Sequence, residues 1–204
     1  MTDVALATED ELSEAVGLKL LSEHHALTAT KALLLRRNGY GYLRSRMPNW
    51  RQMAGRQIVV VITDLDRIAC PLALLDDWLG AGRPCPRNLL LRVAVHEIES
   101  WLLADHAGMR NLLGKRGRLP ERPDELADPK QTLLSLAQKA PRPVKVDLIA
   151  EIGAVAQQGL GYNRRLVDWV HAEWSPQRAS VKSPSLSRAR RALRDIAEEL
   201  NELD

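Results

Sequence analysis

Two aspartates that follow a run of apolar residues are the first candidates for chemistry in this sequence. Asp64 and Asp66 come directly after the apolar residues 58–62 and Thr63. Two carboxylates held this close repel each other unless a cation or a proton lies between them. Mg2+ prefers oxygen ligands and often takes only one or two protein carboxylates. The pair predicts a site for Mg2+ or Mn2+, and the alternative is that both acids only cap the helix that follows.

Other acidic residues follow apolar runs in the same way. Glu9 comes shortly after the apolar residues 4–7, and Glu97 and Glu99 follow the mainly apolar segment 88–95. Glu9 has an alternative interpretation, because acidic residues in the first turn of a helix favour the positive end of its dipole. Either Glu97 or Glu99 could complete a metal site with the two aspartates.

A parallel sheet is the element that would bring these acids together. A continuous run of β-branched residues, bounded by Gly55 and by charges, is typical of a strand buried on both faces. Ligands of such sheets bind beyond the carboxyl ends of the strands. Residues two apart on a strand point the same way, so Asp64 and Asp66 should share a direction. We therefore expect Glu9, Asp64 and Asp66 to converge at one edge of the sheet.

Periodicity and end signals predict the remaining elements. Thr8 and Glu11 form a capping-box pattern before a helix. We expect strands over residues 4–7, 32–35 and 88–95, a loop over 38–41, and short helices over 49–54 and 71–80. Beyond a linker at 114–128, helices are predicted over 129–139, 144–157 and 163–174, and from Ser183 or Ser185 to the end.

The predicted organisation is an α/β core followed by a helical region. We expect residues 1–105 to form the core, with parallel strands and helices on both faces, and residues 106–204 to form a mainly helical extension packed on it. The sequence has no apolar run long enough to span a membrane. Its acidic N-terminus does not resemble a signal peptide, so a cytoplasmic location is expected.

The charge distribution points to nucleic acid more than the net charge does. The formal net charge is only +3, but residues 24–63 contain no Asp or Glu. This basic segment instead holds cations and aromatic residues: Lys31, Arg36, Arg37, Arg44, Arg46, Arg51, Arg56, Tyr40, Tyr42 and Trp50. Cations suit phosphates and flat rings suit bases. The alternative is an arginine-rich face that is only solvated.

Four segments together resemble a known family. They are Glu9-Asp10-Glu11-Leu12, Asp64-Leu65-Asp66 with Cys70, Glu97-Ile98-Glu99-Ser100-Trp101-Leu102-Leu103-Ala104-Asp105, and Ser183-Pro184-Ser185-Leu186. The chain resembles the Toprim-like bacterial family called domain of unknown function 4276, which is related to the Toprim domains of overcoming-lysogenization-defect nucleases. The resemblance spans nearly the whole chain, and its third segment is the most specific. Toprim nucleases usually have Gly where Asp10 stands.

The resemblance implies a Rossmannoid core and a metal-dependent nuclease that acts on nucleic acid, in a bacterial defence system, with a partner protein such as an ATPase. It implies Glu9 as general acid or base and Asp64 and Asp66 as metal ligands, with Glu97 or Glu99 at a second metal or a water. The phosphate-binding residues that it implies are Arg36, Arg37, Arg44, Lys182 and Arg188.

Two other classes remain open at this stage. A strand followed by Asp-x-Asp also begins the haloacid-dehalogenase phosphatases, although Arg67 and Ile68 fit that pattern poorly. A fold that keeps the acids without activity could bind nucleic acid or a protein in a defence or toxin–antitoxin assembly. The choice among DNA, RNA and a nucleotide as substrate and the oligomeric state stay open.

Overall fold

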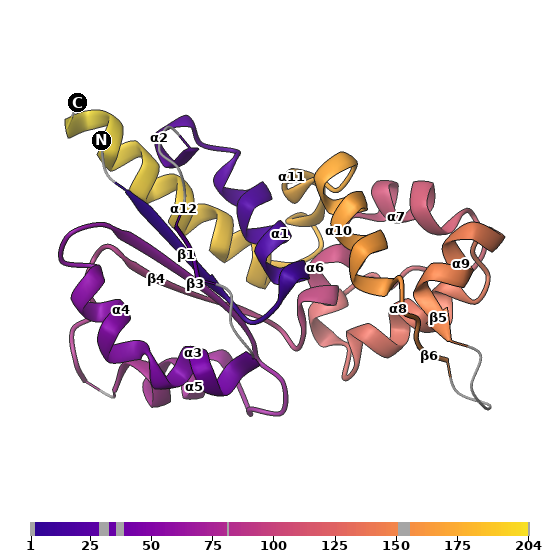
Figure 1. The fold of residues 1–204 in the computed structure, drawn as a ribbon, viewed down its shortest axis with the longest axis horizontal. Coiled ribbons are helices and arrows are strands. Elements are labelled where there is room, and N and C mark those ends of the chain that lie inside the picture. The colour runs from indigo at the N-terminus through magenta and orange to yellow at the C-terminus, as the bar shows by residue number, and fades with distance from the viewer. Residues whose placement is uncertain (1–2, 29–32, 36–38, 81, 151–155, 204) are drawn as a thin grey trace. The chain divides into compact units, whose positions relative to one another are not determined.

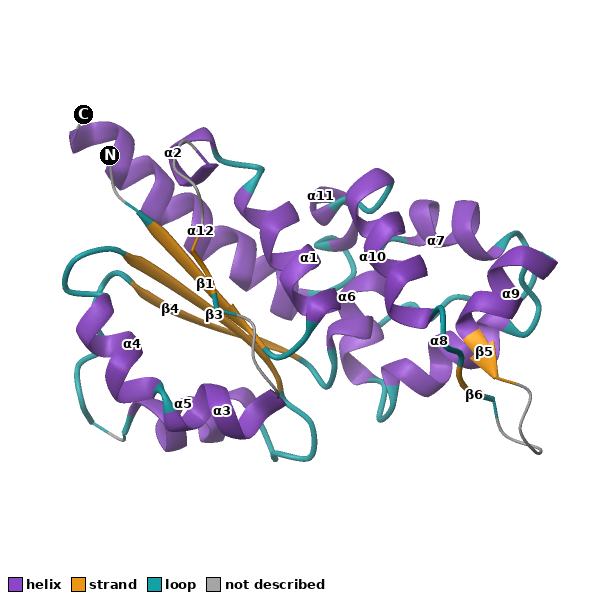
Figure 2. Ribbon diagram, in the orientation of Figure 1, coloured by secondary structure: helices purple, strands orange, loops and turns teal. Residues whose placement is uncertain are grey.

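The computed structural model describes residues 3–28, 33–35, 39–80, 82–150 and 156–203. The chain forms two compact units (Figures 1 and 2). Unit 1 comprises Met1–Ala94 and Arg188–Asp204, and unit 2 comprises Val95–Ser187. The sequence pattern predicts a boundary after residue 105, with residues 106–204 as one extension. The two units instead divide after Ala94, and the end of the chain belongs to unit 1.

Unit 1 is built on a parallel sheet, as predicted. Its strands lie in the order β2-β1-β3-β4, with the bounds Val4–Thr8 (β1), Leu33–Leu34 (β2), Ile58–Asp64 (β3) and Leu89–Ala94 (β4). β3 pairs on both sides, and its side chains are buried from Ile58 to Thr63. The β-branched residues of this run pack well on a pleated surface that is covered on both faces.

Helices cover both faces of this sheet (Figure 1). One face carries α3 (Gly39–Ser45), α4 (Met47–Met53) and α5 (Pro71–Leu79). The other face carries α1 (Glu11–Leu21) and the last helix, α12 (Pro184–Leu203). A short helix, α2, spans His25–Thr28. The α/β class with helices on both faces is therefore confirmed.

The last helix, α12, spans Pro184–Leu203, so it begins in unit 2 and continues in unit 1. Its apolar stripe is buried at Leu193, Ile196 and Ala197. Two ion pairs hold its unit 1 portion to the rest of that unit. Arg190 binds the carboxylate of Glu23 through two nitrogens, each 2.8 Å from an oxygen, and Arg87 pairs with Glu199.

The first helix begins two residues later than the capping-box pattern predicted, because its N-cap is Asp10 and not Thr8. Asp10 is the N-cap of α1, and its carboxylate accepts a hydrogen bond from the Ser13 amide at 2.8 Å. The capping box predicted at Thr8 is wrong, because Thr8 is the last residue of β1 and its hydroxyl donates to the Asp10 carbonyl. Along this helix Gly17 allows close packing, since a Cβ there would lie 2.9 Å from the Leu6 side chain.

The loop predicted over residues 38–41 is wrong from Gly39 onward, where α3 begins. Gly and Asn favour turns locally, but packing overrides that preference here. Leu43 is fully buried, and the Tyr40 ring meets the Trp78 ring edge-on with 5.0 Å between their centroids. These contacts stabilise a short helix that its own sequence would not predict.

Unit 2 is mainly helical, as expected for the second half of the chain. Its helices are α6 (Ile98–Leu103), α7 (His106–Leu113), η1 (Pro123–Glu125), α8 (Pro129–Ala137), α9 (Arg142–Leu148), α10 (Tyr162–Ala172) and α11 (Pro176–Ala179). A two-residue antiparallel pair, β5 (Ile149–Ala150) with β6 (Gln157–Gln158), interrupts them. The helix predicted over 144–157 therefore ends at Leu148, and part of that range lies outside the described residues.

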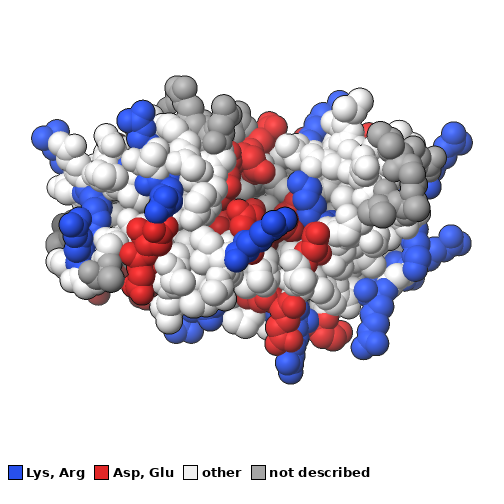
Figure 3. All heavy atoms as spheres, turned by 90° about the horizontal axis from the view of Figure 1, so that it is seen from below, with Lys and Arg blue, Asp and Glu red and all other residues white. Residues whose placement is uncertain are grey.

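The surface carries mixed charges. On the face seen in Figure 3, Lys and Arg side chains are scattered among Asp and Glu and form no single broad basic patch in the part that the structure describes. This agrees with the small net charge of +3. Among the helices of the described residues, none combines the length and the apolar character needed to cross a membrane.

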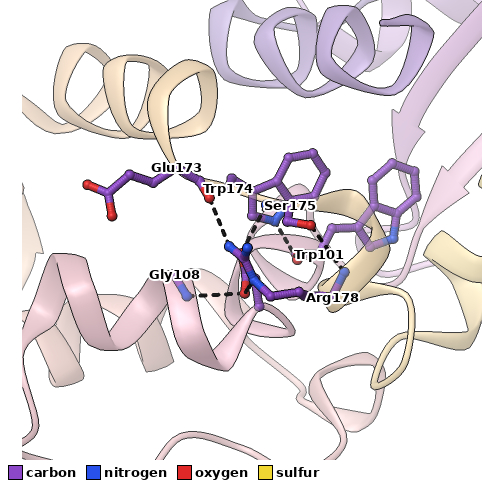
Figure 4. Close-up of polar contacts among 7 residues, drawn as sticks. Trp101, Gly108, Glu173, Trp174, Ser175 and Arg178 are labelled. Atoms are coloured by element: carbon purple, nitrogen blue, oxygen red, sulfur yellow. Dashed lines mark hydrogen bonds and ion pairs between the residues drawn. The ribbon is translucent and has the colours of Figure 1, made fainter. Parts of the chain in front are cut away.

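The core of unit 2 contains a buried carboxylate (Figure 4). Asp105 is fully buried and caps α7, accepting from the Gly108 amide at 3.1 Å. It also accepts from the Ser175 amide at 2.9 Å and from two nitrogens of Arg178 at 2.8 and 2.6 Å. Asp105 lies beyond α6, which ends at Leu103, and is the N-cap of the next helix.

Candidate functional site

The structure brings Glu9 beside the Asp64–Asp66 motif at the carboxyl edge of the sheet. β1 and β3 are parallel, with Thr8 opposite Ile62, so the next residues of both strands lie side by side. Oε1 of Glu9 accepts a hydrogen bond from the Thr63 hydroxyl at 2.5 Å and from the Asp64 amide at 2.9 Å. One carboxylate oxygen of Glu9 therefore binds two residues, Thr63 and Asp64, that lie 54 and 55 positions later in the sequence.

The two aspartates of the motif have different surroundings. Asp64 is the last residue of β3 and is half-buried, whereas Asp66 is exposed and has a φ of +50°. The left-handed region is one that Asp tolerates better than most residues. The strand therefore ends before Asp66, and strand alternation does not set the direction of its side chain, contrary to the expectation. The Leu65 amide, which donates to the Ala94 carbonyl at 2.9 Å, fixes the start of this turn against β4.

Burial raises the pKa of the Glu9 carboxyl above its ordinary value. The hydrogen bonds from Thr63 and the Asp64 amide oppose this shift, because they stabilise the charged form. The negative charges of Asp66 and Asp10 act in the same direction as burial. A carboxyl with a raised pKa at a ligand-binding edge is suited to exchanging protons with a substrate.

The donor atoms at this edge fit a hard divalent cation. Glu9, Asp64 and Asp66 offer only carboxylate oxygens, which suit Mg2+ and Mn2+ better than softer metals. Within the ranges that the structure describes, no three His, Cys, Asp or Glu side chains are grouped so that they could hold an ion together. Mg2+ commonly uses one or two carboxylates and completes its shell with water and substrate phosphate. Asp64 and Asp66 are the pair that would hold it.

Glu97 and Glu99 lie in unit 2 and are bound within it. Glu97 precedes α6, and its Oε2 accepts from the Lys130 amide at the start of α8 at 2.9 Å. Glu99 is only 4% exposed, and its Oε1 accepts from the Tyr162 hydroxyl at 2.8 Å. The Lys130 ammonium lies 5.3 Å from the centroid of the Tyr162 ring. Glu9, Asp64 and Asp66 belong to unit 1.

Burial also raises the pKa of Glu99, with a smaller contribution from the charge of Glu97. Lys130 and the hydrogen bond from Tyr162 oppose the shift. The folded protein therefore holds this proton more tightly than the unfolded chain does. It follows that the contribution of Glu99 to stability is greatest below its ordinary pKa and is lost as the pH rises through the raised value.

We expect Glu99→Gln to remove this pH dependence. Relative to the variant, the wild-type free energy of unfolding should fall as the pH rises above about 4.5, by at most about 1.4 kcal/mol per pH unit. Urea unfolding of both proteins from pH 4.5 to pH 8 measures the difference. Glu125→Gln, at an exposed carboxylate, is the control and should show no such trend. Parallel curves for wild type and Glu99→Gln would contradict the prediction.

The predicted phosphate-binding residues that the structure describes are divided between the two units. Arg36 and Arg37 lie outside the described residues. Arg44 is exposed in unit 1 and pairs with Asp77 at 2.7 Å. Lys182 pairs with Glu121 at 2.6 Å in unit 2, and Arg188 is exposed where α12 enters unit 1.

Sequence reasoning missed Thr63 as a member of the site. Its hydroxyl holds the Glu9 carboxylate from the neighbouring strand. The position of Thr63 could have indicated this role. Thr63 lies near the end of the buried strand β3, beside the residue that follows the parallel strand β1, which is Glu9. The strand register needed to use that signal is not visible in the sequence.

Comparison with known proteins gives no relative from which a function could be inferred. A scan against protein-family models found no match, and searches of curated proteins and of solved structures found none either. The chemistry of the carboxyl edge of the sheet therefore carries the functional argument.

Proposed function

We propose that this chain is a Toprim-like enzyme that uses Mg2+ or Mn2+ to cleave phosphodiester bonds in nucleic acid. One observation carries the proposal: the Glu9 carboxylate is hydrogen-bonded to the Asp64 amide at the carboxyl edge of a parallel sheet. Ligands of such sheets bind at this edge. The sequence resemblance extends the proposal to a cytoplasmic role in bacterial defence.

The side chains of the edge have separate roles in this proposal. Asp64 and Asp66 would hold the metal ion. When bound, the ion polarises a phosphate oxygen and lowers the pKa of a coordinated water. Glu9, kept in place by Thr63 and the Asp64 amide, would take the proton from the attacking water or return one to the leaving oxygen. Its raised pKa brings it closer to neutral pH, where proton transfer in both directions is efficient.

Metal-dependent melting and cleavage test the proposal together. Thermal unfolding of the wild-type protein should shift upward as Mg2+ or Mn2+ is raised to millimolar concentration, because the ion binds only the folded state. Labelled single-stranded and double-stranded DNA and RNA should be cut only when the metal is present. The phosphatase alternative is tested with the substrate p-nitrophenyl phosphate, which the protein should not hydrolyse. If neither metal changes the melting temperature and no substrate is cleaved, the proposal is contradicted and a binding module is favoured.

A further inference from the structure

A segment with aromatic and basic side chains starts at the candidate site. The amide of Gly39, the first residue of α3, donates to the Glu9 carbonyl at 3.3 Å. Leu43 is buried beneath the helix, and the Trp78 indole donates to the Tyr40 hydroxyl at 3.0 Å. These contacts fix α3 against the sheet and α5, with one end at Glu9.

Two side chains of α3, Tyr42 and Arg44, and that of Arg46 directly after the helix are available to a ligand. Tyr42 is half-buried, and the guanidinium of the exposed Arg46 lies over its ring, 5.5 Å from the centroid. Arg44 is 53% exposed and pairs with Asp77, which is 43% exposed. These three residues are called the α3 platform below: Tyr42, Arg44 and Arg46.

Arg51, on α4, has a different role. Its guanidinium donates to the Pro84 carbonyl at 2.9 Å and also to the Leu79 carbonyl. It therefore holds the chain that follows α5 and is committed to structure. This contrast separates the α3 platform from the general basic character of the segment.

We infer that the α3 platform binds single-stranded nucleic acid and leads it to Glu9. Unpaired bases stack on aromatic rings and on guanidinium planes, and such stacking requires base faces that a duplex hides. Tyr42 with Arg46 offers such a surface, and Arg44 lies on the same short helix to contact phosphate. Among the described residues, the scattered charges of Figure 3 offer no broad basic surface for a duplex on the face shown. The inference rests on the proposed function for its direction toward Glu9, but binding is measured separately from cleavage.

Asp77 provides the sharpest test of this inference. An exposed ion pair contributes little stability, so a phosphate can replace Asp77 as the partner of Arg44 at small cost. Asp77 would then compete with the nucleic acid and repel it. Removing its charge should strengthen binding, whereas a residue with only a structural role would have no such effect.

Binding is measured by fluorescence anisotropy in EDTA, so that cleavage cannot occur. The probes are a labelled oligothymidylate of about 12 nucleotides, within the usual site sizes for single strands, an oligouridylate of equal length and a DNA duplex of equal length. The proteins are wild type, Tyr42→Ala, Tyr42→Phe, Arg46→Gln and Asp77→Asn. Arg164→Gln, at an exposed arginine of unit 2, is the control with the same charge change as Arg46→Gln.

We expect Tyr42→Ala to weaken single-strand binding about 5- to 100-fold, the range for losing one stacked base. Tyr42→Phe and Arg164→Gln should bind like wild type, Arg46→Gln more weakly and Asp77→Asn more tightly. The duplex should bind more weakly than either single strand, and comparison of those two strands distinguishes DNA from RNA. Melting curves check folding, and Arg46→Gln and Asp77→Asn decide the case if Tyr42→Ala is unfolded.

Unchanged binding in Arg46→Gln and Asp77→Asn, or a duplex that binds as tightly as the single strands, would overturn the inference. Failure of the proposed function has a different signature. In that case these binding differences persist in EDTA, while the metal-induced melting shift and the cleavage are absent. If the variants show no binding differences but cleavage is intact, the inference about the α3 platform is wrong and the proposed enzymatic function stands.

Discussion

Replacing Asp64 with Asn is expected to abolish both metal binding and cleavage. The variant loses a carboxylate that would hold the ion, so millimolar Mg2+ or Mn2+ should no longer raise its melting temperature. Cleavage should fall by at least about 10²- to 10³-fold, because a bound metal supplies several kcal/mol of charge stabilisation. Without metal, Asp64→Asn should be slightly more stable than wild type, since it relieves repulsion at the edge shared with Glu9 and Asp66.

Two further variants give this result its meaning. Glu9→Gln should lose cleavage by about 10²- to 10⁴-fold through loss of proton transfer, but it should keep a metal-induced shift, since both aspartates remain. Asp76→Asn, at an exposed carboxylate of α5, should behave like wild type in both assays. If Asp64→Asn retains the metal-induced shift of wild type, the ion binds elsewhere. The alternative that the two aspartates cap the following helix is wrong, because the N-cap of α5 is Cys70.

Replacing Asp105 with Ala should cost about 2–4 kcal/mol of stability, because loss of a helix cap costs about 1–2 kcal/mol and a buried donor left without an acceptor costs about 1–3 kcal/mol. The change removes the partner of Arg178, the cap of α7 and the acceptor for the Ser175 amide at once. That is a large part of the roughly 5–15 kcal/mol that stabilises a typical domain. Urea unfolding followed by tryptophan fluorescence measures the loss, since Trp101 and Trp174 are both buried in the same unit.

The matched control lies in the same unit. Glu125→Ala breaks an ion pair with Arg122, but both side chains are more than half exposed, at 65% and 77%. Its effect should stay within about 0.5 kcal/mol. Asp105→Asn should fall between the two, because its amide oxygen can still accept a backbone hydrogen bond. A cost below about 1 kcal/mol for Asp105→Ala would show that the buried carboxylate does not contribute strongly to the stability of unit 2.

The parts of the fold that the sequence predicted are those in which local pattern and burial agree. The apolar run that became β3 could hardly be anything but a central strand, and the helix beginning at Pro71 has a proline in its first turn. α3 was missed because packing of Leu43 and Tyr40 decides it, and contacts with α5 are not visible locally. The return of Arg188–Asp204 to unit 1 also depends on pairing distant in sequence, such as Arg190 with Glu23.

The candidate site was predictable to the same degree. Acids after strands of a parallel sheet must gather at one edge, so the meeting of Glu9 with Asp64 follows from sheet geometry. The turn at Asp66 and the hydroxyl of Thr63 required register and backbone angles that no pattern provides. For Glu99, the sequence indicated an acid near a strand end but could not show that Tyr162, 63 residues later, binds it.

The division of the chain also sets the order in which the two units can be completed during synthesis. Every residue of unit 2 leaves the ribosome before the last stretch of unit 1, Arg188–Asp204. Until then one face of the sheet lacks the helix that covers part of it, because Leu193, Ile196 and Ala197 are buried only when α12 is in place. Domains tend to fold as units as the chain emerges, so a nascent chain that stalls before Arg188 would expose apolar surface on the sheet unit while the inserted helical unit is already whole.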